Sequence, residues 1–177
     1  MGDIGSEFAK KVHAMGASVV GVTRTQKECQ PFVDKMITLN QIEEEIGQAD
    51  VVVSSLPGSS STYQIFNKGM FDKMKKGSFF VNVGRGNAVN SMDLVDALEN
   101  EHLAGAALDV TDPEPLPEDH PLWKAKNVVI TPHVSGFFHL PETFERVVRI
   151  SVDNLRRFEA GEELQNIVDF QTGYRKL

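Results

Sequence analysis

The sequence contains a single cysteine, Cys29, among its 177 residues. One thiol cannot close an internal disulfide, which favours a reducing compartment. No stretch approaches the roughly 20 apolar residues that a membrane-spanning helix needs. The first residues lack the charged and then apolar pattern of a secretory signal peptide. Together these absences favour a cytoplasmic protein that has no membrane partner.

Basic runs are also missing. The formal net charge is −7, from 18 Lys and Arg against 25 Asp and Glu, which argues against a nucleic-acid or anionic-membrane surface. What remains is an ordinary globular composition, 41% hydrophobic and 24% charged. The length is enough for one domain with a sizeable core.

Short apolar segments alternate with segments of helical period along the whole chain. Strands that are apolar on both faces and separated by helices indicate a parallel sheet between helix layers. The predicted fold class is therefore α/β, a Rossmann-like doubly wound parallel sheet. Strands are predicted at 18–22, 51–55, 78–83, 104–110 and 127–130, and helices at 4–15, 41–46 (capped by Asn40), 67–75, from Ser91 through Leu98, and from Phe144 to Gly161.

The opening glycines, Gly2 and Gly5, have the spacing of the last two glycines of the dinucleotide-binding turn G-x-G-x-x-G. That turn normally connects a strand to a helix, and here only the helix follows. We interpret the chain as starting inside the turn, without the first strand and first glycine. The missing strand should leave a gap in the sheet or let its neighbours close on each other. The alternative is an ordinary glycine at a helix start.

The segment Thr23-Arg24-Thr25 follows the next strand, roughly 20 residues beyond the glycines, where a ribose-contacting residue belongs. NAD-preferring proteins usually carry an acid at this place, and none is present. Arg24 can instead pair with a 2′-phosphate through charge-assisted hydrogen bonds. This favours NADPH as the cofactor, although Arg24 could also be a solvated surface residue.

Polar residues follow one predicted strand after another, at the sheet edge where parallel sheets bind ligands. Three segments here, NVGRGNAVN, GAALDVTDPEPLPEDHPLW and NVVITPHVSG, resemble the D-isomer-specific 2-hydroxyacid dehydrogenases. That family includes glyoxylate/hydroxypyruvate reductases, phosphoglycerate dehydrogenases and D-lactate dehydrogenases. The resemblance runs from Gly2 to about Gly161.

Members of that family have two domains, and the nucleotide-binding domain is inserted into the substrate domain. The resemblance therefore implies an incomplete NAD(P)-binding Rossmann domain over residues 1–140. It implies that residues 141–177 are a C-terminal helix and tail that return to a substrate domain absent from this chain.

Three residues that match the family's motifs suit the reduction of a 2-oxo acid. The planar fork of Arg85 can hold the carboxylate and polarise the ketone oxygen. An imidazole such as that of His133 suits a general acid or base. Glu114 would favour the imidazolium form and hold the ring. The alternatives are a surface turn for Arg85, a solvated acidic loop for Glu114 and a structural role for His133.

The other histidines, His13, His102, His120 and His139, are interpreted as surface residues. No convincing metal spacing is present, and hydride transfer requires no metal.

The resemblance also implies the cofactor contacts. Family members often have alanine or threonine at the position of Gly84, so this glycine is expected only to loosen the backbone slightly. The implied contacts are Gly2, Asp3 and Ile4 at the pyrophosphate, Leu56 and Pro57 along the adenine and ribose, Thr62 near the pyrophosphate, Val83 and Gly84 under the nicotinamide ribose, Asp109 at the carboxamide, and Gly136 in the nicotinamide pocket.

The sequence thus predicts an oxidoreductase that transfers a hydride between NAD(P)H and a small 2-oxo acid of the glyoxylate or hydroxypyruvate type. Without the substrate domain the cleft has one wall, so the chain alone should have little activity. The apolar residues within 136–161, among them Phe137, Phe138 and Phe144, are expected to favour a homodimer. Two alternatives remain open: an NAD(P)H sensor without catalysis, and an interaction subunit completed by another chain.

Overall fold

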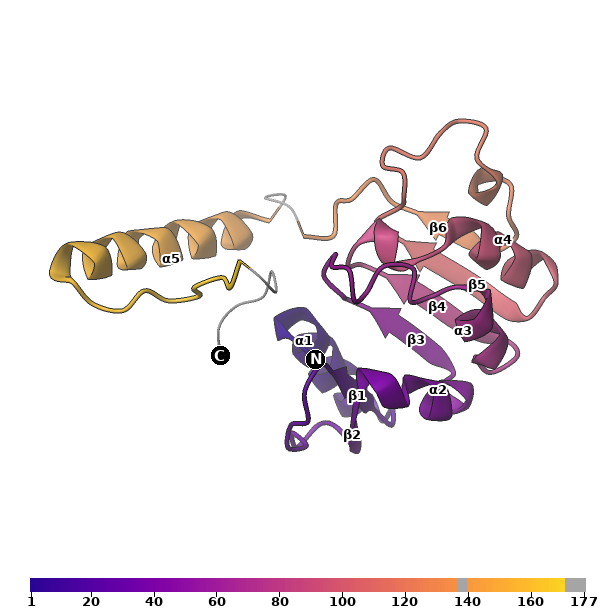
Figure 1. Cartoon of the computed structure of the whole chain (residues 1–177), viewed down its shortest axis with the longest axis horizontal. Coiled ribbons are helices and arrows are strands. Elements are labelled where there is room, and N and C mark those ends of the chain that lie inside the picture. The colour runs from indigo at the N-terminus through magenta and orange to yellow at the C-terminus, as the bar shows by residue number, and fades with distance from the viewer. Residues whose placement is uncertain (137–139, 171–177) are drawn as a thin grey trace. The chain divides into compact units, whose positions relative to one another are not determined.

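A computed structural model describes residues 1–136 and 140–170 (Figure 1). The chain divides into two units, Met1–Pro132 and His133–Leu177. The predicted domain boundary after residue 140 concerns the domains of the family and stays a prediction.

The first unit is built on two parallel sheets. β1 (Val20–Thr23) pairs with β2 (Lys35–Thr38). The other sheet has the order β3 (Val51–Ser54), β4 (Ser78–Asn82), β5 (Leu103–Leu108) and β6 (Val128–Ile130) (Figure 1). Every ladder in both sheets is parallel, so the carboxyl ends of β3–β6 meet at one edge. The predicted parallel α/β fold is confirmed.

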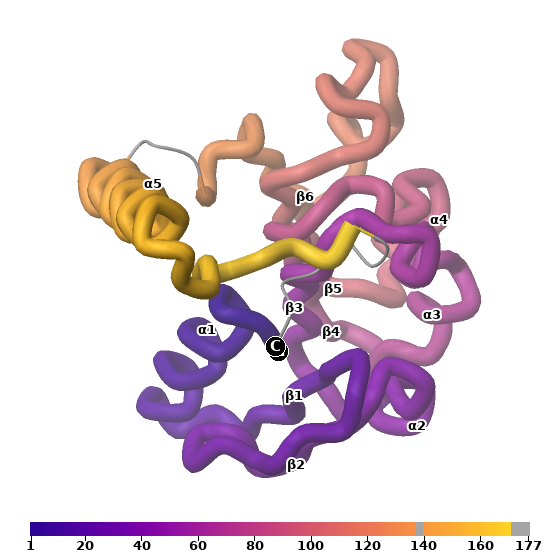
Figure 2. Tube along the Cα trace, turned by 60° about the vertical axis from the view of Figure 1, so that its left-hand side comes forward, coloured from indigo at the N-terminus to yellow at the C-terminus, as the bar shows by residue number. Residues whose placement is uncertain are grey.

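The two sheets are not joined by a ladder among the described residues, because β1 pairs only with β2 and β3 is an edge strand. The sequence left open whether the sheet would have a gap or would close. The structure has a gap between β1 and β3, which Figure 2 shows from another side. The Met1 amine donates a hydrogen bond to the carbonyl of Val22 in β1. Burial lowers the pKa of this amine, and the charge of Lys27 lowers it further.

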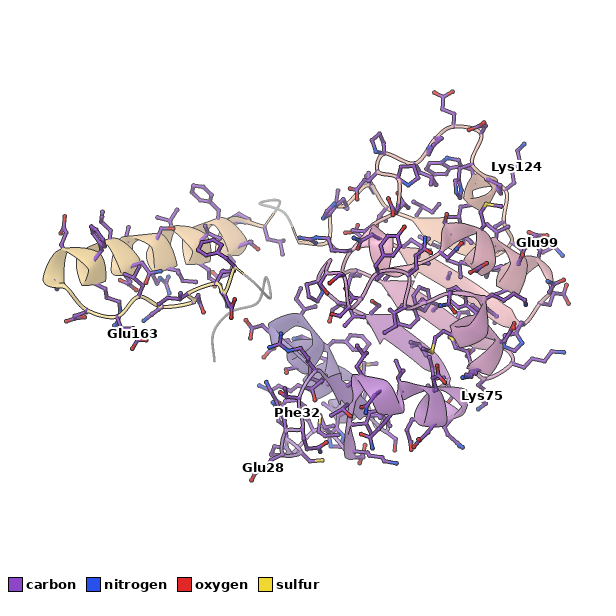
Figure 3. The ribbon with its side chains drawn as sticks, viewed as in Figure 1. Glu28, Phe32, Lys75, Glu99, Lys124 and Glu163 are labelled. Atoms are coloured by element: carbon purple, nitrogen blue, oxygen red, sulfur yellow. The ribbon has the colours of Figure 1, made fainter. Side chains whose placement is uncertain are left out.

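β2 is absent from the strands predicted by the sequence. Its four residues, KMIT, include only two apolar side chains, Met36 and Ile37, which are both buried. Met36 packs with Ala9 of helix α1 (Asp3–Ala14) and with Phe32, labelled in Figure 3, in a small second core. A strand this short becomes stable through that packing and through its pairing with β1. Because neither contact can be recognised in the sequence, the strand was not predicted.

The main core lies between the four-stranded sheet and two helices, α3 (Lys68–Lys73) and α4 (Ser91–Glu99). Phe80 of β4 packs against Phe66 and Phe71, with ring centroids 4.8 and 5.4 Å apart. Both helices begin at asparagine caps, because the Asn67 side chain accepts from the Met70 N–H and the Asn90 side chain accepts from the N–H groups of Met92 and Asp93.

The predicted helix over 41–46 is shorter than expected. α2 covers only Ile42–Glu45 and is flanked by 3₁₀ turns at Leu39–Gln41 and Ile46–Gln48. Asn40 does not cap it. Thr38 is instead the N-cap of the turn that begins at Leu39, and it forms a reciprocal capping box with Gln41.

The second unit contains one long helix, α5 (Pro141–Ala160), which ends at Gly161 in the left-handed conformation at φ 69°. The chain then folds back, since the Asn154 side chain bonds both the N–H and the carbonyl of Gln165. The apolar side chains of Phe144, Leu155 and Phe158 are exposed within this unit. Phe137, Phe138 and His139 lie outside the described residues. Across the described ranges, no helix is both long and apolar enough to span a bilayer.

Candidate functional site

Residues predicted for the site follow β3, β4 and β5 at the shared carboxyl edge of the sheet (Figure 1). Leu56 and Pro57 come after β3, Gly84 and Arg85 after β4, and Asp109 after β5. The parallel register brings these segments together although they are far apart in sequence. Tertiary packing then determines how closely they approach.

Gly84 lies directly against the backbone of the β3 end. A Cβ at Gly84 would come within 2.4 Å of the Leu56 carbonyl oxygen and 2.6 Å of the Leu56 nitrogen. At such distances a side chain at this position would force the backbone at Leu56 to move. The expectation that this glycine only loosens the backbone is therefore wrong for this chain: the close approach of two segments requires it.

Gly86 makes the corresponding approach on the other side of Arg85. A Cβ at Gly86 would lie 1.9 Å from the Thr111 carbonyl oxygen, in the segment that follows β5. Arg85 is thus held between two glycines that contact the neighbouring strand ends. Its side chain is exposed, and its Nη1 donates to the Gly84 carbonyl at 2.8 Å.

Asn82 supports the Arg85 turn from inside. Its side chain has no exposed surface. Its Nδ2 donates to the Arg85 carbonyl at 3.0 Å, and its Oδ1 accepts from the Gly84 N–H at 3.1 Å. Sequence reasoning missed this residue. The available signal was a polar residue at the end of an apolar strand, directly before Gly84-Arg85-Gly86.

Asp109 connects the next two strand ends. Its side chain is almost fully buried, and its Oδ1 accepts from the Thr131 hydroxyl at 2.5 Å. Its backbone N–H donates to the Asn82 carbonyl at 3.0 Å. Glu114 lies further along, exposed, in the loop that follows Thr111. The structure therefore places Arg85, Asp109 and the Glu114 loop at one edge of the first unit.

Thr62 lies in the loop that follows β3. It is buried, its hydroxyl donates to the Pro57 carbonyl at 2.7 Å, and the hydroxyl accepts from the Ser59 N–H at 3.0 Å. These bonds fix the loop after β3 from within. The predicted position of Thr62 near the pyrophosphate stays a prediction.

The start of α1 lies beside the same loop. Gly2 is the N-cap of this helix, with Asp3 and Ile4 in its first turn. A Cβ at Gly5 would lie 3.4 Å from the Ser55 hydroxyl oxygen, next to Leu56. The helix N-terminus, which favours anions, thus reaches the carboxyl end of β3.

An open pocket of about 640 Å³ lies beyond the carboxyl ends of β1 and β2. Arg24, Thr25 and Gln26 line one side, and Thr38, Leu39 and Asn40 the other. The buried Thr23 hydroxyl donates to the Thr25 carbonyl at 2.8 Å, which shapes the turn that carries Arg24. No carboxylate lines this pocket, so its electrostatics suit a phosphate-bearing ribose.

His133 and Gly136 belong to the second unit and are described apart from the residues above. His133 is half-buried and has φ 54°, a left-handed conformation that is uncommon for residues other than glycine. Gly136 is exposed, with open space where a Cβ would be. The convergence of His133 with Arg85 and Glu114 stays a prediction.

Three of the histidines interpreted as surface residues, His13, His102 and His120, are half-buried. His102 is half-buried, and its Nε2 lies 3.0 Å from the Met74 carbonyl oxygen. His120 is also half-buried, with both ring nitrogens in hydrogen bonds. Within residues 1–136 and 140–170, no group of three His, Cys, Asp or Glu side chains is placed to hold a metal ion.

Comparison with known proteins gives consistent matches. "D-isomer specific 2-hydroxyacid dehydrogenase, NAD binding domain" matches residues 1–135. A glyoxylate/hydroxypyruvate reductase A of Citrobacter koseri is 31% identical over 98% of this chain and 54% of its own length. The chain therefore spans about half the length of such curated relatives.

Two solved structures extend the match to three dimensions. A D-isomer specific 2-hydroxyacid dehydrogenase from Xanthobacter autotrophicus, in complex with NADPH and MES, is 35% identical with a TM-score of 0.89, over 98% of this chain and 69% of that one. An NADPH-dependent glyoxylate/hydroxypyruvate reductase from Sinorhizobium meliloti, in complex with NADP and sulfate, is 31% identical with a TM-score of 0.89, over 98% and 55%. The chain belongs to the D-isomer specific 2-hydroxyacid dehydrogenase family and contains its NAD-binding domain.

Proposed function

We propose that this chain is the cofactor-binding part of an NADPH-dependent reductase that acts on a small 2-oxo acid of the glyoxylate or hydroxypyruvate type. The observation that carries the proposal is the placement of Arg85. Two close backbone approaches and buried Asn82 present its guanidinium at the carboxyl edge of a parallel sheet, where such sheets bind ligands. The relatives named above support the substrate class.

The preference for NADPH rests on the pocket beyond β1 and β2. Arg24 is the charged residue in its lining, and a guanidinium binds a phosphate through paired, charge-assisted hydrogen bonds. A carboxylate at this place would repel a 2′-phosphate and bind ribose hydroxyls instead. The complexes with NADPH and NADP among the solved relatives support this choice.

The catalytic roles follow from the chemistry of the substrate. When bound, the nicotinamide would supply a hydride to the ketone carbon, and the resulting alkoxide would need a proton. Arg85 holds the substrate carboxylate and polarises the ketone oxygen. His133 donates the proton that the alkoxide needs, and Glu114 stabilises the imidazolium before transfer. The Asp109 side chain is held by the hydrogen bond that it accepts from Thr131. It would orient the carboxamide of the bound cofactor.

The first test measures cofactor binding to the 177-residue chain by calorimetry or NADPH fluorescence. We expect NADPH to bind more tightly than NADH. Arg24→Ala should weaken NADPH binding about tenfold to a hundredfold, because it removes charge-assisted hydrogen bonds to the 2′-phosphate. It should leave NADH binding unchanged, because NADH has no 2′-phosphate. Arg156→Ala on α5 is the matched control. Equal affinities for both cofactors in the unaltered chain would contradict the proposal.

The second test examines chemistry. Residues 1–177 replace the matching segment of the S. meliloti reductase, and NADPH oxidation is followed with glyoxylate. The chimera should turn over, and Arg85→Ala or His133→Ala should lower kcat/KM by about a hundredfold or more. A soluble chimera that binds NADPH and has no turnover would instead support a sensor without catalysis.

A further inference from the structure

His120 makes two hydrogen bonds at the end of the acidic loop, the segment 112–119 that carries Glu114. Its Nδ1 accepts from the Leu122 backbone N–H at 3.1 Å, and its Nε2 lies 3.1 Å from the Ser91 hydroxyl oxygen. Ser91 is the first residue of α4, while His120 caps the 3₁₀ turn Pro121–Trp123. The ring therefore connects the end of the loop to the start of a core helix.

The partners determine the protonation state of this ring. A backbone N–H can only donate, so Nδ1 must be an unprotonated acceptor. The ring proton then belongs to Nε2, which donates to the Ser91 hydroxyl. A ring protonated on both nitrogens would have no acceptor for the Leu122 N–H. The geometry thus assigns one neutral tautomer to His120.

The loop that His120 closes is the one that carries Glu114. Leu122, next to the ring, is fully buried in the main core, and Leu116 packs against the same core. The Pro117 carbonyl accepts from the His120 N–H at 3.1 Å and from the Trp123 indole N–H at 2.8 Å. Figure 3 labels Lys124, where the chain leaves this turn, and Glu99 on the neighbouring α4.

The other end of the loop is also held. Gly86 packs against the Thr111 backbone, and the Thr111 hydroxyl donates to the Pro113 carbonyl at 3.0 Å. Between Pro113 and Leu116 the only residue with chemistry for the reaction is Glu114. Its position relative to the sheet edge therefore depends in part on how the loop is held at Thr111 and at His120.

We propose that His120, as the neutral Nε2–H tautomer, is a positioning residue that fixes the loop carrying Glu114 onto the start of α4. The role of this anchor in catalysis rests on the proposed function, in which Glu114 stabilises the imidazolium form of His133. The anchor itself is tested without activity, so its failure can be told apart from failure of the proposed function.

The experiment uses the 177-residue chain and two reporters. Trp123 is the single tryptophan of the chain and donates to the loop, so its emission and acrylamide quenching report loop closure. Amide hydrogen exchange at Leu122 reports the bond to Nδ1 directly, and ¹⁵N NMR of the ring reports the tautomer. The variants are His120→Ala, His120→Asn and Ser91→Ala. His102→Ala is the control, because that ring bonds Met74 away from the loop.

We expect His120→Ala to lower the protection of the Leu122 amide about fivefold to tenfold and to raise Trp123 quenching. His120→Asn should restore that protection, because an asparagine oxygen accepts from the N–H two residues on. Ser91→Ala should raise Trp123 quenching and leave most of the Leu122 protection. If His120→Ala does not fold, His120→Asn and Ser91→Ala decide the question by the same reporters.

Three outcomes would overturn the proposal. The first is unchanged Leu122 exchange and Trp123 quenching in His120→Ala. The second is an equal effect of His102→Ala on both reporters. The third is a ring ¹⁵N spectrum in which Nδ1 carries the proton.

Discussion

At the scale of single residues, Gly84 and Gly86 determine where Arg85 stands. Each lets the backbone of the Arg85 turn touch a neighbouring segment, Leu56 on one side and Thr111 on the other. Asn82 then closes the turn with two buried hydrogen bonds. The position of the guanidinium therefore depends on these backbone contacts. A side chain added at Gly84 or Gly86 should lower the free energy of unfolding.

Gly86→Ala tests this argument. Its new methyl group would meet the Thr111 carbonyl oxygen at 1.9 Å, so the segment after β5 must move. We expect a loss of about 1 to 3 kcal/mol in the free energy of unfolding, the usual cost of overpacking, measured by urea denaturation. Gly136→Ala is the control, since nothing lies near its Cβ position. Equal stability of the two variants would show that the approach at Gly86 is not tight.

At the scale of elements, α5 differs from the helices of the first unit. α3 and α4 bury phenylalanine, leucine and valine side chains in the main core. α5 has no buried residue, and its apolar face, including Phe144, Leu155 and Phe158, is exposed within its unit. A contiguous exposed apolar face of this kind is typical of an interaction surface.

The prediction at this scale is self-association through α5. The unaltered chain should show a concentration-dependent increase in mass by light scattering, because burial of this face releases water from apolar surface. Leu155→Glu together with Phe158→Glu should shift the chain toward the monomer. Glu159→Gln, on the same helix turn, should change nothing. A clean monomer of the unaltered chain at high concentration would contradict the predicted dimer.

At the scale of the whole molecule, the first unit has a sheet in two parts. β1 and β3 both present an edge without a ladder partner among the described residues, and Val51 on β3 is half exposed. Reductases of this family are about twice as long as this chain. In the predicted two-domain arrangement, the site residues of the first unit would form only one wall of the active-site cleft.

We therefore predict little or no turnover by the isolated chain. Hydride transfer needs a site from which water is excluded, and one wall does not provide it. The measurement is NADPH oxidation with glyoxylate or hydroxypyruvate, with cofactor binding checked on the same sample. Turnover comparable to that of a complete reductase would refute the prediction.

The sequence predicted the elements whose stability is local or whose apolar character is strong. β3, β4 and β5 are mainly apolar segments. Gly161, at the end of α5, is a residue type that commonly terminates helices. β2 was missed because its two apolar residues become a strand only through contacts with α1 and β1. Asn82 and His120 were missed for the same reason, since their partners are found only after the chain has folded.

By itself, the sequence determined the parallel α/β class, the family, and the candidate residues Arg24, Arg85, Glu114 and His133, because periodicity and short motifs are carried by neighbouring residues. Only the tertiary structure decided that Gly84 and Gly86 lie directly against neighbouring backbone, that the Thr62 hydroxyl faces its own loop, and that the His120 ring bonds Ser91 at the start of α4. These features depend on the distances between backbone segments far apart in sequence. Such distances are set by packing and strand register, which no local pattern encodes.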